Sequence, residues 1–326
     1  MKAFISTVPF GDKNQLPLEI LSQNNIEYLI NPLGRKLTED ELASFMSDVD
    51  FLIAGTEPIG EKVFDQSKKL KLISRVGIGL DSVDLIQARE RNITVAYTPD
   101  APAPAVAELT IGLMLSLLRQ VHISNSQMHA GQWHRFFGRR IADVTIGVIG
   151  LGRIGQRVLN RIHAFGTPKL LLNDIKPDEE IGRRYKVDWV DRETIFREAD
   201  LISIHVPLTK HTQNMITRKD LLMMKDDAML INVARGGIIN EQDLYDVMSL
   251  GHLSGVALDV YDEEPYRGRL AEIERCLLTA HMGSMSIDCR TRMEIEATEA
   301  VVSFSKGLGL RSEVPKTEYD IQEEGL

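Results

Sequence analysis

The chain has 326 residues, of which 43% are hydrophobic and 26% are charged, an ordinary composition for a globular protein with room for two domains. The formal net charge of -9 argues against nucleic-acid binding, which requires a basic face, but it permits a local basic pocket for a small anionic substrate. The two cysteines, Cys276 and Cys289, are too few for a disulfide framework, and neither belongs to a metal-binding pattern, so no metal site is expected.

Strand-like segments alternate with amphipathic segments in the first third of the chain. The strand-like segments are residues 2–7, 26–31, 49–56, 70–77 and 93–99. Strands that alternate with helices predict βαβ units, and therefore a parallel sheet that is covered by helices on both faces.

The sequence predicts a domain boundary where Pro99, Pro102 and Pro104 interrupt this alternation, because closely spaced prolines prevent a regular element. A long helix is expected from about Pro104. A second alternating series then occupies residues 144–150, 169–175, 187–190, 200–208, 228–234, 253–261 and 276–283.

A further amphipathic helix, from about Ser286 to Lys306, is expected to return the chain to the first domain. The acidic segment 312–326 is expected to be frayed or loosely docked. The fold prediction is therefore two doubly wound α/β domains, one made of residues 1–99 plus 287–326 and the other of residues 100–286.

The start of the chain and its apolar segments predict a cytoplasmic protein. The sequence "MKAFISTVPF" lacks the apolar core and small residues of a signal peptide. The most apolar helical segment, "LTIGLMLSLL", is too short and too interrupted to span a membrane. Reduced thiols and no membrane partner are therefore expected.

A glycine motif opens the second series: a strand is followed by Gly150-Leu-Gly152-Arg-Ile-Gly155 and then by a helix. Gly150 permits a tight turn, Gly152 lets the backbone approach a pyrophosphate, and Gly155 lets helix and strand pack closely. Free amides and a partial positive charge at the helix N-terminus favour phosphate groups. The motif predicts a dinucleotide site.

Asp174 ends the next strand-like segment, about 20 residues after the last glycine, as in dinucleotide-binding folds. A carboxylate at this position accepts hydrogen bonds from the ribose hydroxyls and repels a 2'-phosphate. We therefore expect NAD to be preferred over NADP, with Lys176 nearby moderating the preference.

Polar residues stand at the ends of several predicted strands, where ligands bind in open parallel sheets. They are Asp174, His205, Arg235, Asp259 and His281. Arginine binds a carboxylate through two parallel hydrogen bonds, and histidine transfers protons near neutral pH. Beside a dinucleotide, these residues suggest hydride transfer to or from a carboxylated ketone or alcohol. Spacing alone does not decide whether His205 or His281 is the acid/base.

Between about Leu72 and Ser284 the chain resembles the D-isomer-specific 2-hydroxyacid dehydrogenase family. The resemblance lies in the ordered motifs "VGIGLD", "AVAE", "GLGRIG", "HVPLT", "NVARGG", "ALDVYDEEP" and "HMGS". It implies a flavodoxin-like substrate domain and a Rossmann NAD-binding domain, with the active site between them. It also implies a homodimer, formed through the helix after Pro104 and residues 131–140.

The resemblance assigns roles to individual residues. Arg235 would bind the substrate carboxylate and carbonyl, Glu264 would orient the histidine, and His281 would be the acid/base. The implied substrate-binding residues are Arg75, which could reach a distal phosphate, and the loop residues Val76 and Gly77, whose amides would hold the carboxylate. The implied cofactor-binding residues, besides the three glycines, are Arg153, Ile154, Asp174, His205, Val206, Pro207, Thr212, Val233, Ala234, Asp259, Gly283 and Ser284.

The substrate is left open within the family. "SRVGIGLDSVD" and "AVAELTIGLML" are most similar to the 3-phosphoglycerate dehydrogenase branch, whereas Glu57 and Pro58 stand where that branch often has basic residues. The "DAPAPAVAE" segment also departs from that branch. Glyoxylate, hydroxypyruvate, lactate-like acids and phosphonates remain alternatives. Corepressors of the same fold, which bind the nucleotide as a structural ligand, are the alternative of a different class.

Overall fold

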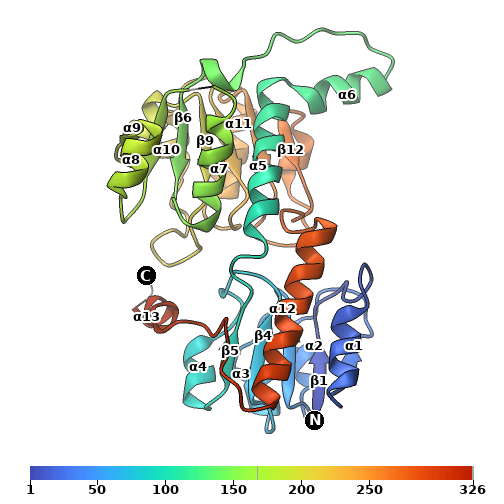
Figure 1. Ribbon diagram of the computed structural model, residues 1–326. Coiled ribbons are helices and arrows are strands. Elements are labelled where there is room, and N and C mark those ends of the chain that lie inside the picture. The colour runs from blue at the N-terminus through green and yellow to red at the C-terminus, as the bar shows by residue number, and fades with distance from the viewer. Residues whose placement is uncertain (167, 325–326) are drawn as a thin grey trace. The chain divides into compact units, whose positions relative to one another are not determined.

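The computed structural model describes residues 1–166 and 168–324, which fold into two α/β units (Figure 1). The first unit contains Met1–Pro102 and Met285–Leu326, and the second contains Ala103–Ser284. Each unit has one sheet in which every strand pair is parallel, so the predicted fold class is confirmed.

The first unit has a five-stranded sheet with the order β2-β1-β3-β4-β5, the flavodoxin-like order. The order reverses between β1 and β3, so a crevice for ligands is expected beyond the carboxyl ends of these strands. The strands are β1 (Lys2–Ile5), β2 (Glu27–Ile30), β3 (Phe51–Ala54), β4 (Leu72–Arg75) and β5 (Thr94–Ala96).

Helices cover both faces of this sheet (Figure 1). One face packs against the first and the long twelfth helix, and Phe4, Leu52 and Ile73 on the other face share a core with the second, third and fourth helices. Local capping sets some of the helix starts: Thr38 and Glu41 form a capping box, and the side chain of Asp84 accepts from Gln87 N. The helices are α1 (Leu16–Gln23), α2 (Glu39–Ser44), α3 (Glu61–Gln66), α4 (Leu85–Glu90), α12 (Ile287–Ser305) and α13 (Lys316–Glu324).

The C-terminal segment, expected to be frayed or loosely docked, is docked in its described residues. Residues 316–324 form α13, which packs against α4. The side chain of Gln322 accepts a hydrogen bond from Leu85 N at 2.6 Å and donates one to Val83 O at 2.9 Å. Buried Val314 joins the core of this unit. These long-range contacts stabilise a segment whose composition is acidic and polar.

The second unit has a seven-stranded sheet with the order β12-β11-β10-β9-β6-β7-β8. This is the doubly wound Rossmann order with one added strand, and it reverses between β6 and β9. The strands are β6 (Ile146–Ile149), β7 (Leu170–Asn173), β8 (Asp188–Trp189), β9 (Leu201–Ile204), β10 (Met229–Asn232), β11 (Gly255–Leu258) and β12 (Cys276–Leu278).

Side chains of the central strands alternate between two cores, as the period of a strand requires. On β10, Met229 and Ile231 pack with helices of one face, and Leu230 packs with helices of the other. Because both faces are buried, these strands are continuous apolar runs in the sequence. Cys276 and Cys289 are both free. The helices of this unit are α5 (Ala103–Leu118), α6 (Val121–His129), α7 (Arg153–His163), α8 (Glu179–Tyr185), α9 (Arg192–Glu198), α10 (Arg218–Met223) and α11 (Glu241–Ser249).

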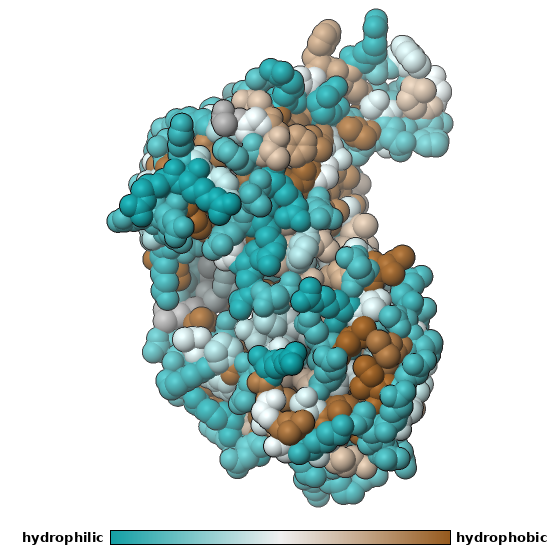
Figure 2. All heavy atoms as spheres, in the orientation of Figure 1, coloured by the Kyte–Doolittle hydropathy of each residue, from teal (hydrophilic) through white to brown (hydrophobic). Residues whose placement is uncertain are grey.

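A projecting arm follows α5. The chain bends by 66° into α6 at Gln120, whose φ is 51°, and residues 130–140 then extend away from this unit before returning to it (Figure 1). Trp133 and Phe137 are 81% and 100% exposed, and Figure 2 shows apolar atoms among hydrophilic ones in this region. Within the described chain no single helix has the length and apolar composition to cross a membrane, and only the bent pair α5 and α6, taken together, meets that test.

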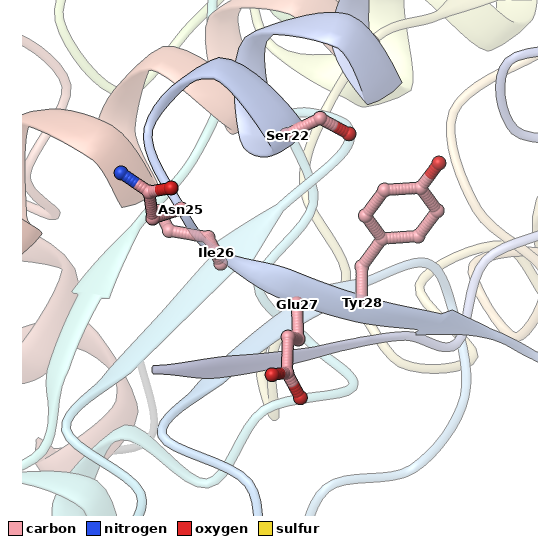
Figure 3. A pocket seen from close by; sticks show the side chains of 5 residues that line it. All are labelled: Ser22, Asn25, Ile26, Glu27 and Tyr28. Carbon is pink, nitrogen blue, oxygen red and sulfur yellow. The ribbon is translucent and has the colours of Figure 1, made fainter.

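A shallow hollow lies at the edge strand of the first unit (Figure 3). It is lined by the end of α1, the following turn and the start of β2, where Tyr28 and Glu27 point in opposite directions. Glu27 pairs with Lys2, so the hollow lies at the amino ends of the strands. Ligands of such sheets bind at the opposite edge, so this hollow is not the candidate site.

Candidate active site

The glycine motif is built as the sequence predicts. Gly150 has a φ of +94°, and a Cβ there would lie 2.6 Å from His205 O. A Cβ on Gly155 would lie 2.0 Å from Gly150 O, so helix α7 packs directly on the turn. Gly152 is exposed, and no atom lies within 4 Å of the place that a Cβ would take. A ligand can therefore approach the backbone at Gly152, whereas positions 150 and 155 have no room for a side chain.

The surroundings of this turn fit the pyrophosphate and ribose of a dinucleotide. Helix α7 starts at Arg153, so the amides of its first turn are directed out of its N-terminus, where an anion is favoured. Asp174 Oδ2 accepts a hydrogen bond from Leu151 N at 2.6 Å, and its Oδ1 accepts one from Lys176 N at 2.8 Å. The carboxylate is thus fixed beside the glycine turn.

His205 follows β9, next to the glycine turn. Its Nε2 lies 2.8 Å from Ser203 Oγ, and its Nδ1 is buried without a hydrogen-bond partner in the described part of the chain. Burial lowers the pKa of His205 to about 3, so the imidazole is neutral near pH 7. An imidazole that stays neutral near pH 7 is poorly suited to donating a proton, which supports a structural role for His205.

A histidine–carboxylate pair forms at the carboxyl edge of the second sheet. His281 Nδ1 lies 2.8 Å from Glu264 Oε2 and 3.0 Å from Glu264 Oε1. Glu264 belongs to the loop after β11, and His281 to the loop after β12, the neighbouring strand. The neighbouring Glu263 is exposed. The structure therefore brings together the two residues to which the family resemblance assigned the roles of acid/base and orienting partner.

Asp259 fixes the loop that carries His281. This side chain is 1% exposed; its Oδ1 accepts from Thr279 Oγ1 at 2.6 Å and from Met282 N at 2.8 Å, and its Oδ2 accepts from Gly283 N at 2.8 Å. Between these contacts, His281 has a φ of 48°, an unfavourable conformation for a non-glycine residue. The three bonds hold the histidine in this strained conformation.

Arg235 follows β10, the strand next to β11. Asn232 Nδ2 donates to Arg235 O at 2.8 Å, and Asn232 Oδ1 accepts from Ala234 N at 3.0 Å, so one side chain shapes the turn. Arg235 Nη1 donates to Ala234 O at 2.7 Å. A Cβ on Gly236 would lie 2.0 Å from Tyr261 O, so the turn packs on the loop of Glu264. The arginine and the histidine–carboxylate pair thus share one edge of the sheet.

The other residues predicted to bind the cofactor also lie at this edge. Thr212 Oγ1 donates to Pro207 O at 2.6 Å and accepts from Thr209 N at 2.7 Å, which closes the turn after β9. Ile154 is the second residue of α7, and Val206 lies in the loop after β9. The remaining predicted residues lie in the loops after β10 and β12: Val233, Ala234, Gly283 and Ser284. Among the described residues, no group of three or more His, Cys, Asp or Glu side chains is arranged to hold a metal ion.

The predicted substrate loop follows β4 in the first unit. Arg75 is 5% exposed, and its Nη1 donates to Val76 O at 2.6 Å. Val76 N donates to Ala54 O at 2.8 Å, and Gly77 N donates to Thr98 Oγ1 at 2.7 Å. Both amides therefore donate within the chain in this structure, and their role in binding a substrate carboxylate stays a prediction.

Glu57 lies at the same edge of the first sheet and is 2% exposed. Its Oε1 accepts hydrogen bonds from Gly55 N at 2.8 Å and from Ser6 Oγ. These contacts join the loops after β1 and β3, where the strand order reverses. Glu57 is the acidic residue that stands where the phosphoglycerate branch often has a basic one, and its carboxylate is held by these two hydrogen bonds.

The family model described as "D-isomer specific 2-hydroxyacid dehydrogenase, NAD binding domain" matches residues 111–283. The chain belongs to this family. It is an NAD-dependent oxidoreductase, and the second unit is its NAD-binding domain.

Two curated relatives and one solved structure illustrate the similarity. A hydroxypyruvate reductase of Thermotoga maritima is 36% identical over 81% of this chain and 88% of its own length. A D-3-phosphoglycerate dehydrogenase of Methanocaldococcus jannaschii is 36% identical over 83% of this chain, which spans about half (52%) of that relative. The crystal structure of a glyoxylate reductase from Paecilomyes thermophila has a TM-score of 0.84 and 26% identity, covering 97% of this chain and 99% of that one.

Sequence reasoning missed several residues that build the dehydrogenase site. Asn232 and Thr279 have no catalytic chemistry of their own, and their contacts shape the turns that carry Arg235 and His281. The only available signal was position: Asn232 directly precedes the "VARGG" turn at the end of a predicted strand.

Proposed function

We propose that this dehydrogenase interconverts a small 2-oxo acid and the corresponding D-2-hydroxy acid. The observation that carries the proposal is the 2.8 Å contact of His281 Nδ1 with Glu264 Oε2, at the same sheet edge as Arg235. NAD, when bound, supplies the nicotinamide ring that gives or accepts a hydride. The chain's own residues bind the acid, orient it and move the proton.

His281 is assigned the proton transfer. Its Nδ1 faces the Glu264 carboxylate, so Nε2 is the nitrogen that would exchange a proton with the substrate oxygen. Glu264 keeps the ring in one orientation and stabilises the imidazolium that forms when the hydroxyl proton is accepted. Arg235 would grip the carboxylate with two parallel hydrogen bonds and align the carbonyl.

A small substrate without a phosphate is favoured, with hydroxypyruvate and glyoxylate as the first candidates. The names of the Thermotoga and Paecilomyes proteins support these candidates. The sequence has Glu57 and Pro58 where the phosphoglycerate branch often has basic residues, which disfavours a phosphorylated substrate. Phosphoglycerate is the second candidate, because the Methanocaldococcus relative carries that name.

NAD is proposed as the preferred nucleotide over NADP because of Asp174. The amides of Leu151 and Lys176 fix its carboxylate beside the glycine turn, and a fixed charge repels a 2'-phosphate more effectively than a mobile one.

A homodimer is proposed to form through α5 and residues 131–140. The exposed Trp133 and Phe137 support this, since large exposed apolar side chains mark interaction surfaces. Light scattering at micromolar concentration measures the mass, and replacement of both residues by serine is expected to shift it toward the monomer.

The test of function is loss of NADH absorbance with a panel of 2-oxo acids that includes glyoxylate, hydroxypyruvate, pyruvate and phosphohydroxypyruvate. Turnover of an unphosphorylated acid is expected. Tight NADH binding without turnover of any acid would instead support the alternative of a nucleotide-dependent binding protein. The intact pair of His281 and Glu264 favours turnover.

A further inference from the structure

Glu241 contacts the loop that carries Glu264. It is the first residue of α11, whose start is capped by Asn240 through its contact with Asp243 N at 2.9 Å. Glu241 is half-buried, and its Oε1 accepts a hydrogen bond from Asp262 N at 2.7 Å. The side chain thus reaches from the helix start to the backbone of another loop.

Two successive amides of this loop donate to two different glutamates. Tyr261 N donates to Glu264 Oε1 at 3.3 Å, and Asp262 N donates to Glu241 Oε1 at 2.7 Å. The first bond folds the loop onto its own carboxylate. The second ties the next peptide to α11, so the position of the Glu264 carboxylate depends on where Glu241 holds the loop.

The same peptide also lies against the turn of Arg235. A Cβ on Gly236 would lie 2.1 Å from Tyr261 C and 2.6 Å from Asp262 N, so the two backbones are in direct contact. Gly236 lies between Arg235 and α11 in the chain. The Tyr261–Asp262 peptide is therefore held by the Arg235 turn and by Glu241 together.

The charge on Glu241 has an electrostatic cost at this place. Burial raises the pKa of Glu241, the hydrogen bond from Asp262 N lowers it, and the nearby charges of Asp262 and Glu264 raise it again. A third carboxylate beside the Glu264 loop is thus unfavourable by itself. What the site gains from it is a hydrogen-bond acceptor of fixed geometry.

We propose that Glu241 is a positioning residue for the reaction. By accepting a hydrogen bond from Asp262 N, it holds the loop where Glu264 contacts His281 and where the loop packs against the turn of Arg235. The inference rests on the proposed function of the His281–Glu264 pair. It assigns Glu241 no contact with substrate or cofactor.

The test compares three substitutions of Glu241. Glu241→Gln keeps an oxygen acceptor and removes the charge, so kcat is expected to stay within about twofold of the parent. Glu241→Ala removes the acceptor, and kcat is expected to fall by about 10-fold or more at unchanged KM for NADH, since small misplacement of reacting groups is costly. The kcat of Glu241→Asp, which keeps a carboxylate on a shorter side chain, is expected to lie between the kcat values of the Gln and Ala variants. Glu193→Ala is the matched control, because Glu193 is an exposed acidic residue in the first turn of α9.

Hydrogen exchange gives a readout that does not depend on turnover. In Glu241→Ala the amide of Asp262 is expected to exchange faster than in the parent, while Glu241→Gln preserves its protection. Unchanged kcat or unchanged Asp262 protection in Glu241→Ala would overturn the proposal. Equal losses of kcat in Glu241→Gln and Glu241→Ala would also overturn it, because the effect would then come from the charge of Glu241 and not from its hydrogen-bond acceptor. If the parent reduces no 2-oxo acid but the exchange pattern holds, the proposed reaction fails and the loop contact stands.

Discussion

Asp259 holds the amide of Gly283 at 2.8 Å, and this bond crosses from the end of β11 to the loop that carries His281. Together with the bond to Met282 N, it keeps both amides after the histidine on one carboxylate. Because these contacts use both oxygens, the carboxylate of Asp259 binds only the loop of His281 in the hydrogen bonds of the described residues. Its main effect on the reaction is therefore expected through His281.

Asp259→Asn is predicted to lower both stability and kcat. The asparagine NH2 group would face either Gly283 N or Met282 N, donor against donor, and a buried unpaired amide costs about 1–3 kcal/mol. Chemical denaturation would measure the loss of stability, and steady-state kinetics the fall in kcat. The dissociation constant for NADH is expected to change little. A large rise in that constant at unchanged kcat would show that Asp259 acts on the cofactor instead.

Arg235→Lys is predicted to raise KM for the oxo acid and to lower kcat, with a combined loss of about 10²-fold in kcat/KM. Lysine keeps the charge but lacks the planar two-pronged contact with a carboxylate. Arg267→Lys, an exposed substitution in the same unit, is the control. Near-parental kinetics in a folded Arg235→Lys protein would remove Arg235 from the site.

Asp174→Ser is predicted to narrow the preference for NADH. The parent is expected to use NADH with the higher kcat/KM, and removal of the fixed charge should reduce the ratio by about tenfold, which corresponds to about 1.4 kcal/mol of lost repulsion. The measurement compares kcat/KM for NADH and NADPH with one accepted oxo acid. Equal use of both nucleotides by the parent would contradict the assignment of Asp174.

His205 gives a prediction about stability and pH. The folded pKa of about 3 lies below the ordinary value of 6.5, so the unfolded chain binds the additional proton between these values. Stability therefore falls as pH decreases from about 6.5 toward 3, by at most about 1.4 kcal/mol per pH unit for this group. His205→Gln removes the titration and is expected to flatten this part of the curve. Parallel curves for parent and variant would show that His205 titrates normally.

The two-unit fold was predictable because parallel strands with two buried faces are apolar runs in the sequence. The bend at Gln120 was not, because no glycine or proline marks it. The contacts of α13 were not either, because they join Gln322 to Val83 and Leu85, which are distant in the sequence. In the site, spacing could not separate His205 from His281. The structure separates them by surroundings, since His205 has a buried Nδ1 and contacts a hydroxyl, whereas His281 faces a carboxylate.

The partners of Asp259 were equally invisible in the sequence. Its carboxylate binds amides 23 and 24 residues further along the chain, at the end of the neighbouring strand. No local pattern encodes such a contact, because it exists only once β11 and β12 are paired.

The last prediction concerns the proton carried by His281. Glu264→Gln keeps the shape and a hydrogen-bond acceptor but removes the negative charge that stabilises the imidazolium. In the reductive direction the protonated ring must donate, so the alkaline limb of kcat/KM is expected to move to lower pH. In the oxidative direction the neutral ring must accept, so activity is expected to begin at lower pH. His281→Asn should instead depress both directions by about 10²–10⁴-fold at every pH, because the proton carrier is gone. The measurement is kcat/KM against pH for parent and Glu264→Gln in both directions, with Glu263→Gln as the control, since Glu263 is exposed. If the parent and Glu264→Gln profiles superimpose, Glu264 is not coupled to the catalytic proton, and the assignment of the pair is wrong.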